Sequence, residues 1–277
     1  MKRIGISKGY FFVAPGVLGI TIFYLIPMCE VLFRSFVSTT RNGSISLDNY
    51  VIVFQNEAFQ LAVVNTAKFS IICIPLLLIL SFLIACFMQM VGKNSKIWKK
   101  ILLLPMSVPV VALAILCQVI FSEYGFANFL LKLIGKSSIN WLHSANALLV
   151  LVFIYLWKNI GYTCILWLAG MAQIDEEVYE AAKVDGATRS QSILNITIPL
   201  LKPYFFIILI ISFIRSFQIF REAYLIAGEY PDESIYTIQH LLNNWYRDMY
   251  FERISVVSVI VLLLVICLTL IWKKQQE

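Results

Sequence analysis

The sequence predicts an all-helical integral membrane protein with about six transmembrane helices. Hydrophobic residues make up 60% of the 277 residues and charged residues only 14%, so one soluble core cannot bury the apolar surface. The apolar runs have the length, about 20 residues, that a helix needs to cross a bilayer. Lysine and arginine gather at the ends of these runs, where they act as topology signals.

The expected spans follow the apolar runs along the chain. They cover about residues 10–33, 67–90, 101–121, 147–170, 203–226 and 254–272. The first run is too long for a signal-peptide core and has no clear small-residue cleavage site, so we expect it to remain uncleaved. No soluble domain, tandem repeat or low-complexity tract interrupts the series. We therefore expect one membrane domain over residues 1–277.

The basic clusters predict that both termini lie in the cytoplasm. Lys2 and Arg3 precede the first run, Lys93–Lys100 follows the second, and Lys273 and Lys274 follow the last. With six spans, this orientation places all of these clusters on the inner side, as the positive-inside rule requires. The clusters also explain the net charge of +6 without nucleic acid as a partner.

The polar segment 171–202, between the fourth and fifth spans, has the pattern of two short helices joined by a turn. Asp175 is expected to cap a helix that runs to about Lys183, and Gly186 allows the backbone to turn. A helix of this kind either lies against the membrane surface or docks on a partner.

The second short helix is expected to begin at Thr188, because Gln191 three residues later completes a capping box. Pro199 and Pro203 are expected to stop this helix and lead into the fifth span.

Several motifs in and around this segment resemble a known family. The series Glu180-Ala181-Ala182, three residues, Gly186, nine residues, Ile196-Thr197-Ile198-Pro199 resembles the signature loop of the membrane subunits of binding-protein-dependent ATP-binding-cassette importers. Further motifs resemble the carbohydrate-type permeases, in particular the maltose-transporter-like first subunit: Leu104-Pro105, Trp157-Lys158 with Gly161, Leu168-Ala169-Gly170 and Asp185-Gly186-Ala187. The chain departs from the family at Ile198, where leucine is usual, and at Gly228-Glu229-Tyr230-Pro231, where Gly-Gly-Pro is frequent.

The resemblance implies a type I importer bundle, like that of methionine-importer permeases, in the cytoplasmic membrane of a bacterium. It implies a coupling helix that inserts into the ATPase, with contacts from Tyr179, Glu180, Ala181, Ala182, Asp185 and Gly186. The implied partners are a second homologous permease, two ATPase subunits that bind ATP and Mg, an external solute-binding protein, a saccharide substrate and membrane lipid. The alternatives are an importer of another polar solute, such as a glycerol phosphate, and an ion-coupled secondary transporter.

Polar side chains recur at helical spacing within the fourth and fifth spans. Hydroxyl groups of a sugar need hydrogen-bond partners, its ring faces stack on aromatic groups, and the family places its sugar site on these two spans. The substrate-path candidates are Lys158, Asn159, Tyr162, Ser212, Arg215 and Gln218. The alternative is that the charged groups Lys158, Arg215, Arg221 and Glu222 pair with one another or with the second permease, purely for assembly.

No catalytic or metal-binding residue is expected in this chain. Gly135-Lys136-Ser137 ends like a phosphate-binding loop, but Leu130 stands where that motif requires glycine. His143 and His240 lie far apart in predicted outer segments, so we expect neither a metal site nor an acid/base pair from them. A membrane-embedded enzyme would need His, Asp, Glu or Cys clustered at one depth, and the sequence offers no such cluster.

Overall fold

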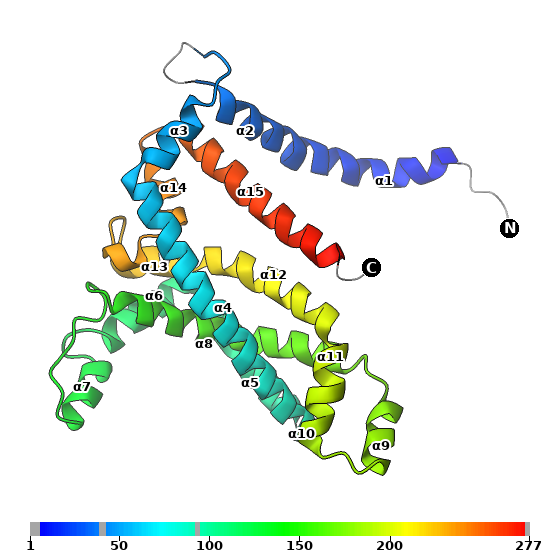
Figure 1. Cartoon of the computed structure of the whole chain (residues 1–277). Helices are drawn as coiled ribbons and strands as arrows, with labels where there is room; N and C mark the ends of the chain where they lie inside the picture. The colour runs from blue at the N-terminus through cyan, green and yellow to red at the C-terminus, as the bar shows by residue number, and fades with distance from the viewer. Residues whose placement is uncertain (1–5, 39–42, 92–94, 275–277) are drawn as a thin grey trace. The chain divides into compact units, whose positions relative to one another are not determined.

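The computed structural model describes residues 6–38, 43–91 and 95–274 (Figure 1). Lys2, Arg3 and Lys93, which contribute to the predicted topology, lie outside the described residues. The described helices form two compact units: the described part of Met1–Gln60 with Leu242–Cys267, and Leu61–Leu241 with the described part of Leu268–Glu277.

The first unit begins with a long apolar helix. Its helices are α1 (Ile6–Ile20), the π-helical turn η1 (Thr21–Leu25), α2 (Ile26–Phe36), α3 (Asp48–Gln55), and most of α14 (Ile238–Arg247) and α15 (Phe251–Lys274). Pro27 has no backbone N–H and lies just after η1, so the wider π turn accommodates it without breaking the helix. Buried Asn49 joins α3 to the end of α2, because its Nδ2 donates to the carbonyl of Val37 at 2.7 Å.

The second unit contains the remaining helices. They are nearly all of α4 (Glu57–Val91), α5 (Ser95–Ser107), α6 (Val110–Ile120), α7 (Phe126–Leu133), α8 (Ala147–Met171), α9 (Glu176–Val184), α10 (Arg189–Ser192), the π turn η3 (Ile193–Thr197), α11 (Ile198–Leu200), α12 (Lys202–Gln218), α13 (Phe220–Ala227) and the 3₁₀ turn η4 (Glu233–Ile235).

Five helical stretches among the described residues are long and apolar enough to cross a membrane. They are Tyr10–Phe36, Glu57–Val91, Ala147–Met171, Lys202–Ala227 and Phe251–Ile271. The pair Ile97–Ser107 and Val110–Ile120 makes a sixth if the two helices count as one span. The prediction of an all-helical protein with about six spans is therefore confirmed. Helix α4 begins at Glu57, well before the expected start of the second span near residue 67.

The expected third span is a bent pair of helices. Helices α5 and α6 meet at an angle of 88°. Pro109 adopts an extended conformation with φ −58° and ψ 138°, and proline also disfavours helical geometry at the residue before it, Val108. Pro105, by contrast, lies inside α5 and does not end it. Of these two prolines, only the second breaks the helix.

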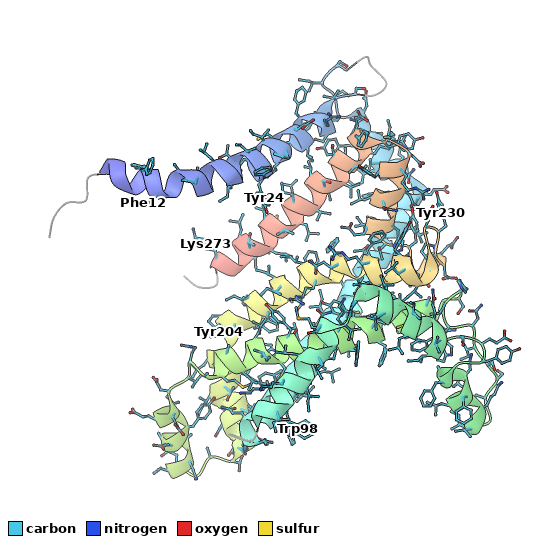
Figure 2. The ribbon with its side chains drawn as sticks, turned by 180° about the vertical axis from the view of Figure 1, so that it is seen from behind. Phe12, Tyr24, Trp98, Tyr204, Tyr230 and Lys273 are labelled. Carbon is cyan, nitrogen blue, oxygen red and sulfur yellow. The ribbon has the colours of Figure 1, made fainter. Side chains whose placement is uncertain are left out.

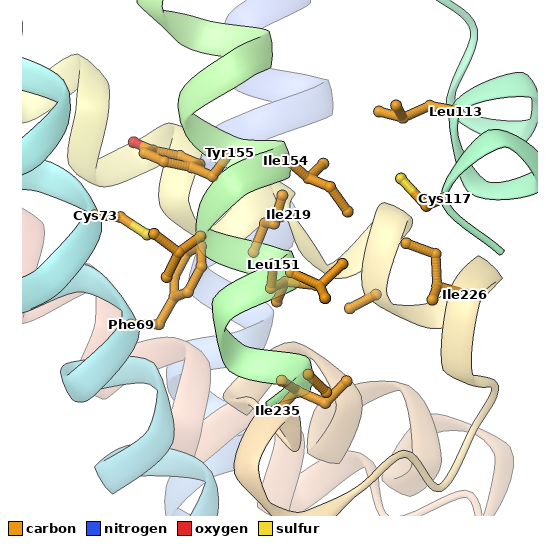
Figure 3. Close-up of a cluster of buried hydrophobic side chains, with 14 of the residues drawn as sticks. Phe69, Cys73, Leu113, Cys117, Leu151, Ile154, Tyr155, Ile219, Ile226 and Ile235 are labelled. Carbon is orange, nitrogen blue, oxygen red and sulfur yellow. The ribbon is translucent and has the colours of Figure 1, made fainter. Parts of the chain in front are cut away.

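Helix α8 lies in the middle of the core of the second unit. Figure 3 shows Phe69 and Cys73 of α4 on the same side of α8 as Tyr155, with Cys117 of α6 on the opposite side. Helix α5 approaches α8 closely at Gly161, where an added Cβ would stand 1.7 Å from the carbonyl oxygen of Leu102. The glycine is therefore required by the close contact between these two backbones.

The second unit has two clearly different ends. In Figures 1 and 2, α9 lies at the same end as Trp98 of α5 and Tyr204 of α12, whereas α7 and Tyr230 lie at the other end. The ends of α4 and α8 therefore lie on one side of the unit. The predicted cytoplasmic segment 171–202 belongs to this end.

Candidate functional site

Two of the candidate helices, α8 and α12, are joined by hydrogen bonds between their facing sides. Tyr155 is fully buried, and its hydroxyl donates to the backbone carbonyl of Ser212 at 2.7 Å. Ser212 is itself only 2% exposed, so it lies inside the contact between the helices. This bond fixes the polar stripe of α8 against that of α12.

An ionic contact joins Lys158 of α8 to Glu222 of α13. The ammonium group of Lys158 donates to a carboxylate oxygen of Glu222, and the two side chains are 19% and 4% exposed. Burial of either charge alone is expensive, so the contact offsets part of the desolvation cost of both groups. The alternative considered from the sequence, that the charged groups pair with one another, therefore holds for Lys158 and Glu222.

Arg215 of α12 has different neighbours. Its Nη1 donates to Oδ1 of Asn159 at 3.1 Å, and its guanidinium lies over the ring of Tyr162, 4.1 Å from the centroid. Asn159 is held in this orientation because its Nδ2 donates to the carbonyl of Tyr155 at 2.8 Å. A stacked guanidinium with a fixed amide beside it is a rigid group.

These side chains surround a small notch, defined here as the cavity of about 180 Å³ between α5, α6, α8, α12 and α13. Its lining residues are Met106, Val110, Tyr155, Lys158, Asn159, Arg215, Gln218, Ile219, Arg221 and Glu222. Four of the six predicted substrate-path residues therefore line one cavity. Tyr162 lies beneath Arg215, and Ser212 is buried beside the notch.

Sequence reasoning missed the wall that α5 and α6 contribute. Met106 and Val110 lie on either side of the bend at Pro109, and both line the notch. They are apolar and belong to a span with no polar stripe, so their residue types carry no functional signal. Pro109 is the sequence feature that could have indicated the bend.

At the other end of the unit, the segment 171–202 forms the expected helix, turn and helix. Gly186 adopts a positive φ of +79°, and its N–H donates to the carbonyl of Lys183 at 3.1 Å. The capping box at Thr188 and Gln191 is present, with the N–H of Thr188 donating to Oε1 of Gln191 at 2.7 Å. Both predictions are confirmed.

Two local predictions in this segment are wrong. Asp175 stands at the N-cap of α9, but its side chain makes no capping hydrogen bond. Pro199 does not stop the second helix, because the π turn η3 widens the helix just before it and α11 continues through it. The chain then passes Leu201 and enters α12 with Pro203 in its first turn, where proline is tolerated.

Helix α9 makes few contacts with its own chain. None of its residues is buried, and Glu180, Ala181, Asp185 and Gly186 are exposed. A cavity of about 820 Å³ lies between α9, α10 and the ends of α4 and α8. Tyr179 joins the helix to the body through a hydrogen bond of 2.9 Å between its hydroxyl and Oγ1 of Thr197, which is buried.

An all-helical membrane fold with an exposed helix between its fourth and fifth spans defines a class of transport subunit. The family model for the inner membrane component of binding-protein-dependent transport systems matches residues 77–274. The chain belongs to this family. It is therefore a multi-pass membrane permease of such a system. In this family, ATP is bound by a partner ATPase and not by the permease.

Individual relatives match over nearly the whole chain. The chain is 28% identical to the permease protein MalF of a trehalose/maltose transport system from Thermococcus litoralis, over 96% of this chain and 92% of that protein. It is 30% identical to the arabinooligosaccharide permease AraP of Bacillus subtilis, with 94% and 87% covered. It is also 30% identical to the lactose permease LacF of Rhizobium radiobacter, with 97% and 94% covered.

The fold is similar to that of a chain in the crystal structure of a bacterial ABC transporter involved in the import of alginate, an acidic polysaccharide. The TM-score is 0.83 at 23% identity, over 98% of this chain and 96% of that one. At this identity, the match establishes the fold.

Proposed function

We propose that this chain is one of two permease subunits in an ATP-driven importer of saccharides, and that α9 is its coupling helix. The exposure of α9 carries the proposal, because a helix of nine residues with no buried side chain is not stabilised by its own core. A partner that covers it would supply the missing contacts. The sugar transport systems named for three relatives support the saccharide class.

The proposed complex contains a second, homologous permease, two ATPase subunits on the cytoplasmic side and a solute-binding protein on the outer side. Both termini of this chain lie in the cytoplasm. Glu180, Ala181 and Ala182 form the contact with the ATPase, Tyr179 and Asp185 flank it, and Gly186 makes the turn. When the ATPases close on ATP, α9 moves with them and Tyr179 passes the movement to η3 and α12.

The notch is the proposed contribution of this chain to the substrate path. It presents a guanidinium, an amide and an ion pair beside an aromatic ring, which are groups that bind hydroxyls and stack on sugar faces. Lys158, Asn159, Arg215 and Gln218 line it, Tyr162 supports Arg215, and Ser212 anchors the helices around it. The single small notch supplies only half of a path that the second permease completes.

The test is the ATPase activity of the complete complex in liposomes, measured with its binding protein and a panel of oligosaccharides. We expect a saccharide to stimulate hydrolysis, and we expect Glu180→Lys to abolish the stimulation and the co-purification of the ATPase. Glu123→Lys makes the same charge change at an exposed position outside α9 and should leave co-purification unchanged. Full coupling in Glu180→Lys would contradict the role of α9, and indifference to every saccharide would contradict the substrate class.

A further inference from the structure

Two partly buried cations of the notch, Lys158 and Arg215, differ in how their charge is compensated. Lys158 is paired with Glu222, whose side chain is almost entirely buried. This pair therefore adds no net charge to the cavity. A second ion pair joins Arg34 to Glu30, and among the residues that the structure describes Arg215 belongs to no ion pair. The positive charge of Arg215 is therefore not neutralised by a carboxylate of the described chain.

The partners that Arg215 does have are neutral. An amide oxygen of Asn159 accepts one N–H, and the ring of Tyr162 covers one face of the guanidinium. These contacts hold the group in place and compensate part of its lost hydration. They leave a surplus of positive charge inside an apolar span, where insertion of a cation costs at least ~2.5 kcal/mol.

The stacking on Tyr162 also leaves the edge of the guanidinium, which carries its N–H donors, uncovered by the ring. Stacking occupies the face of the group, whereas its donors lie in the plane, along the edge. One of the five N–H donors is directed to Asn159, and the group lines the cavity. A fixed, planar edge with several donors matches the two oxygens of a carboxylate or phosphate.

The other residues that line the notch add to the positive electrostatic potential around Arg215. Three cationic side chains line it, those of Lys158, Arg215 and Arg221, against the single carboxylate of Glu222. Gln218 and Asn159 contribute neutral amides. A neutral sugar would satisfy the hydrogen-bond donors but would leave the positive charge uncompensated. An anionic sugar would satisfy the donors and also compensate the charge.

We infer that Arg215 is a specificity residue of the substrate path, and that it favours saccharides carrying an anionic group, a carboxylate or a phosphate, over neutral ones. The inference rests on the proposed function, since it requires the notch to face the passing sugar. It concerns the permease itself, apart from any selection by the binding protein. Its mechanism is the stacked and amide-bound guanidinium, which needs no rearrangement to receive two oxygens.

The test compares matched substrates in the complete complex in liposomes. A uronate-containing oligosaccharide is compared with its carboxyl-reduced, neutral counterpart, each at saturating loaded binding protein, and a sugar phosphate provides the third substrate. The wild-type complex should transport an anionic substrate roughly tenfold faster, the ratio that 1.4 kcal/mol of differential interaction produces. Preference for the sugar phosphate over the uronate would identify phosphate as the anionic group.

Three variants separate specificity from structure. Arg215→Gln should lose the preference by slowing the anionic substrate, while Arg215→Lys should retain part of it, because it keeps the charge without the planar edge. Arg253→Gln is the matched control, since Arg253 also stacks on a tyrosine, 4.3 Å from the ring centroid of Tyr250, but outside the notch. It should keep the full preference.

The opposing outcomes are distinct. Equal transport of neutral and anionic saccharides by the wild type, or an unchanged preference in Arg215→Gln, would overturn the inference and leave the importer intact. Failure to transport any saccharide would overturn the proposed substrate class together with the inference. If Arg215→Gln loses the second permease while Arg215→Lys retains it with unchanged preference, the residue serves assembly and the inference is wrong.

Discussion

The notch and helix α9 solve opposite physical problems. In the notch, Lys158 and Arg215 lie inside apolar spans, and each contacts a partner far away in the sequence. Lys158 contacts Glu222, 64 residues later, and Arg215 contacts Asn159, 56 residues earlier. Helix α9 lies outside the spans, buries none of its residues and depends on contacts within a short segment. The comparison teaches that this chain holds the polar groups of the notch rigidly and leaves helix α9 unsupported by its own core.

Removal of one charge from the buried pair should have the largest effect of the variants considered. Glu222→Gln leaves Lys158 charged without its carboxylate, which costs about 3–5 kcal/mol for a buried pair. We expect a marked loss of assembled complex and a lower melting temperature in detergent. The double variant Lys158→Met, Glu222→Gln removes both charges and should recover most of the stability. Normal melting of Glu222→Gln alone would show that Lys158 has another partner.

A methyl group at the closest helix contact should have the next largest effect. Gly161→Ala places its Cβ 1.7 Å from the carbonyl oxygen of Leu102, so α5 and α8 must move apart. Overpacking of this kind costs roughly 1–3 kcal/mol, and it should also widen the notch. Gly16→Ala is the control, because no atom lies within 4 Å of its added Cβ, and its melting temperature should not fall. Equal melting of the two variants would contradict the tight α5–α8 contact.

A substitution at Gly186, in the exposed segment, should affect binding of the ATPase and not the stability of the permease. Gly186 has nothing within 4 Å of an added Cβ, but its φ is +79°, so Gly186→Ala strains the turn by about 1–2 kcal/mol without touching the core. We expect unchanged melting of the permease and reduced co-purification of the ATPase. Gly43→Ala imposes similar strain at φ +81° in another loop and should leave the ATPase bound. A loss of ATPase in both variants would point to a general defect.

The smallest effect is expected at the single hydrogen bond that joins α9 to the body. Tyr179→Phe removes the contact with Thr197, which is worth about 1 kcal/mol. Faster amide hydrogen exchange in α9 and partly uncoupled ATPase activity should follow, with normal assembly. Tyr230→Phe, at an exposed tyrosine, is the control. Unchanged exchange in Tyr179→Phe would mean that the hydroxyl does not restrain the helix.

The accuracy of the sequence-based expectations follows the same division. Gly186 and the capping box of Thr188 and Gln191 were predictable because their partners lie within a few residues of them. The predictions that Asp175 caps α9 and that Pro199 stops the second helix failed. Asp175 is exposed to solvent and makes no capping hydrogen bond, and a π turn accommodates the proline. The predicted polar stripes located four notch residues, but they did not reveal Met106 or Val110.

The sequence by itself determined the class of this protein: apolar runs of membrane length, basic residues at their ends, and a polar segment with a recognisable signature. These properties depend on composition and on short-range spacing, which a linear chain displays directly. Only the tertiary structure decided which charges are paired. Lys158 forms an ion pair with Glu222, whereas Arg215 donates a hydrogen bond to Asn159 and stacks on Tyr162. Such pairings depend on the packing and rotation of whole helices, which are set by contacts between residues far apart in the chain.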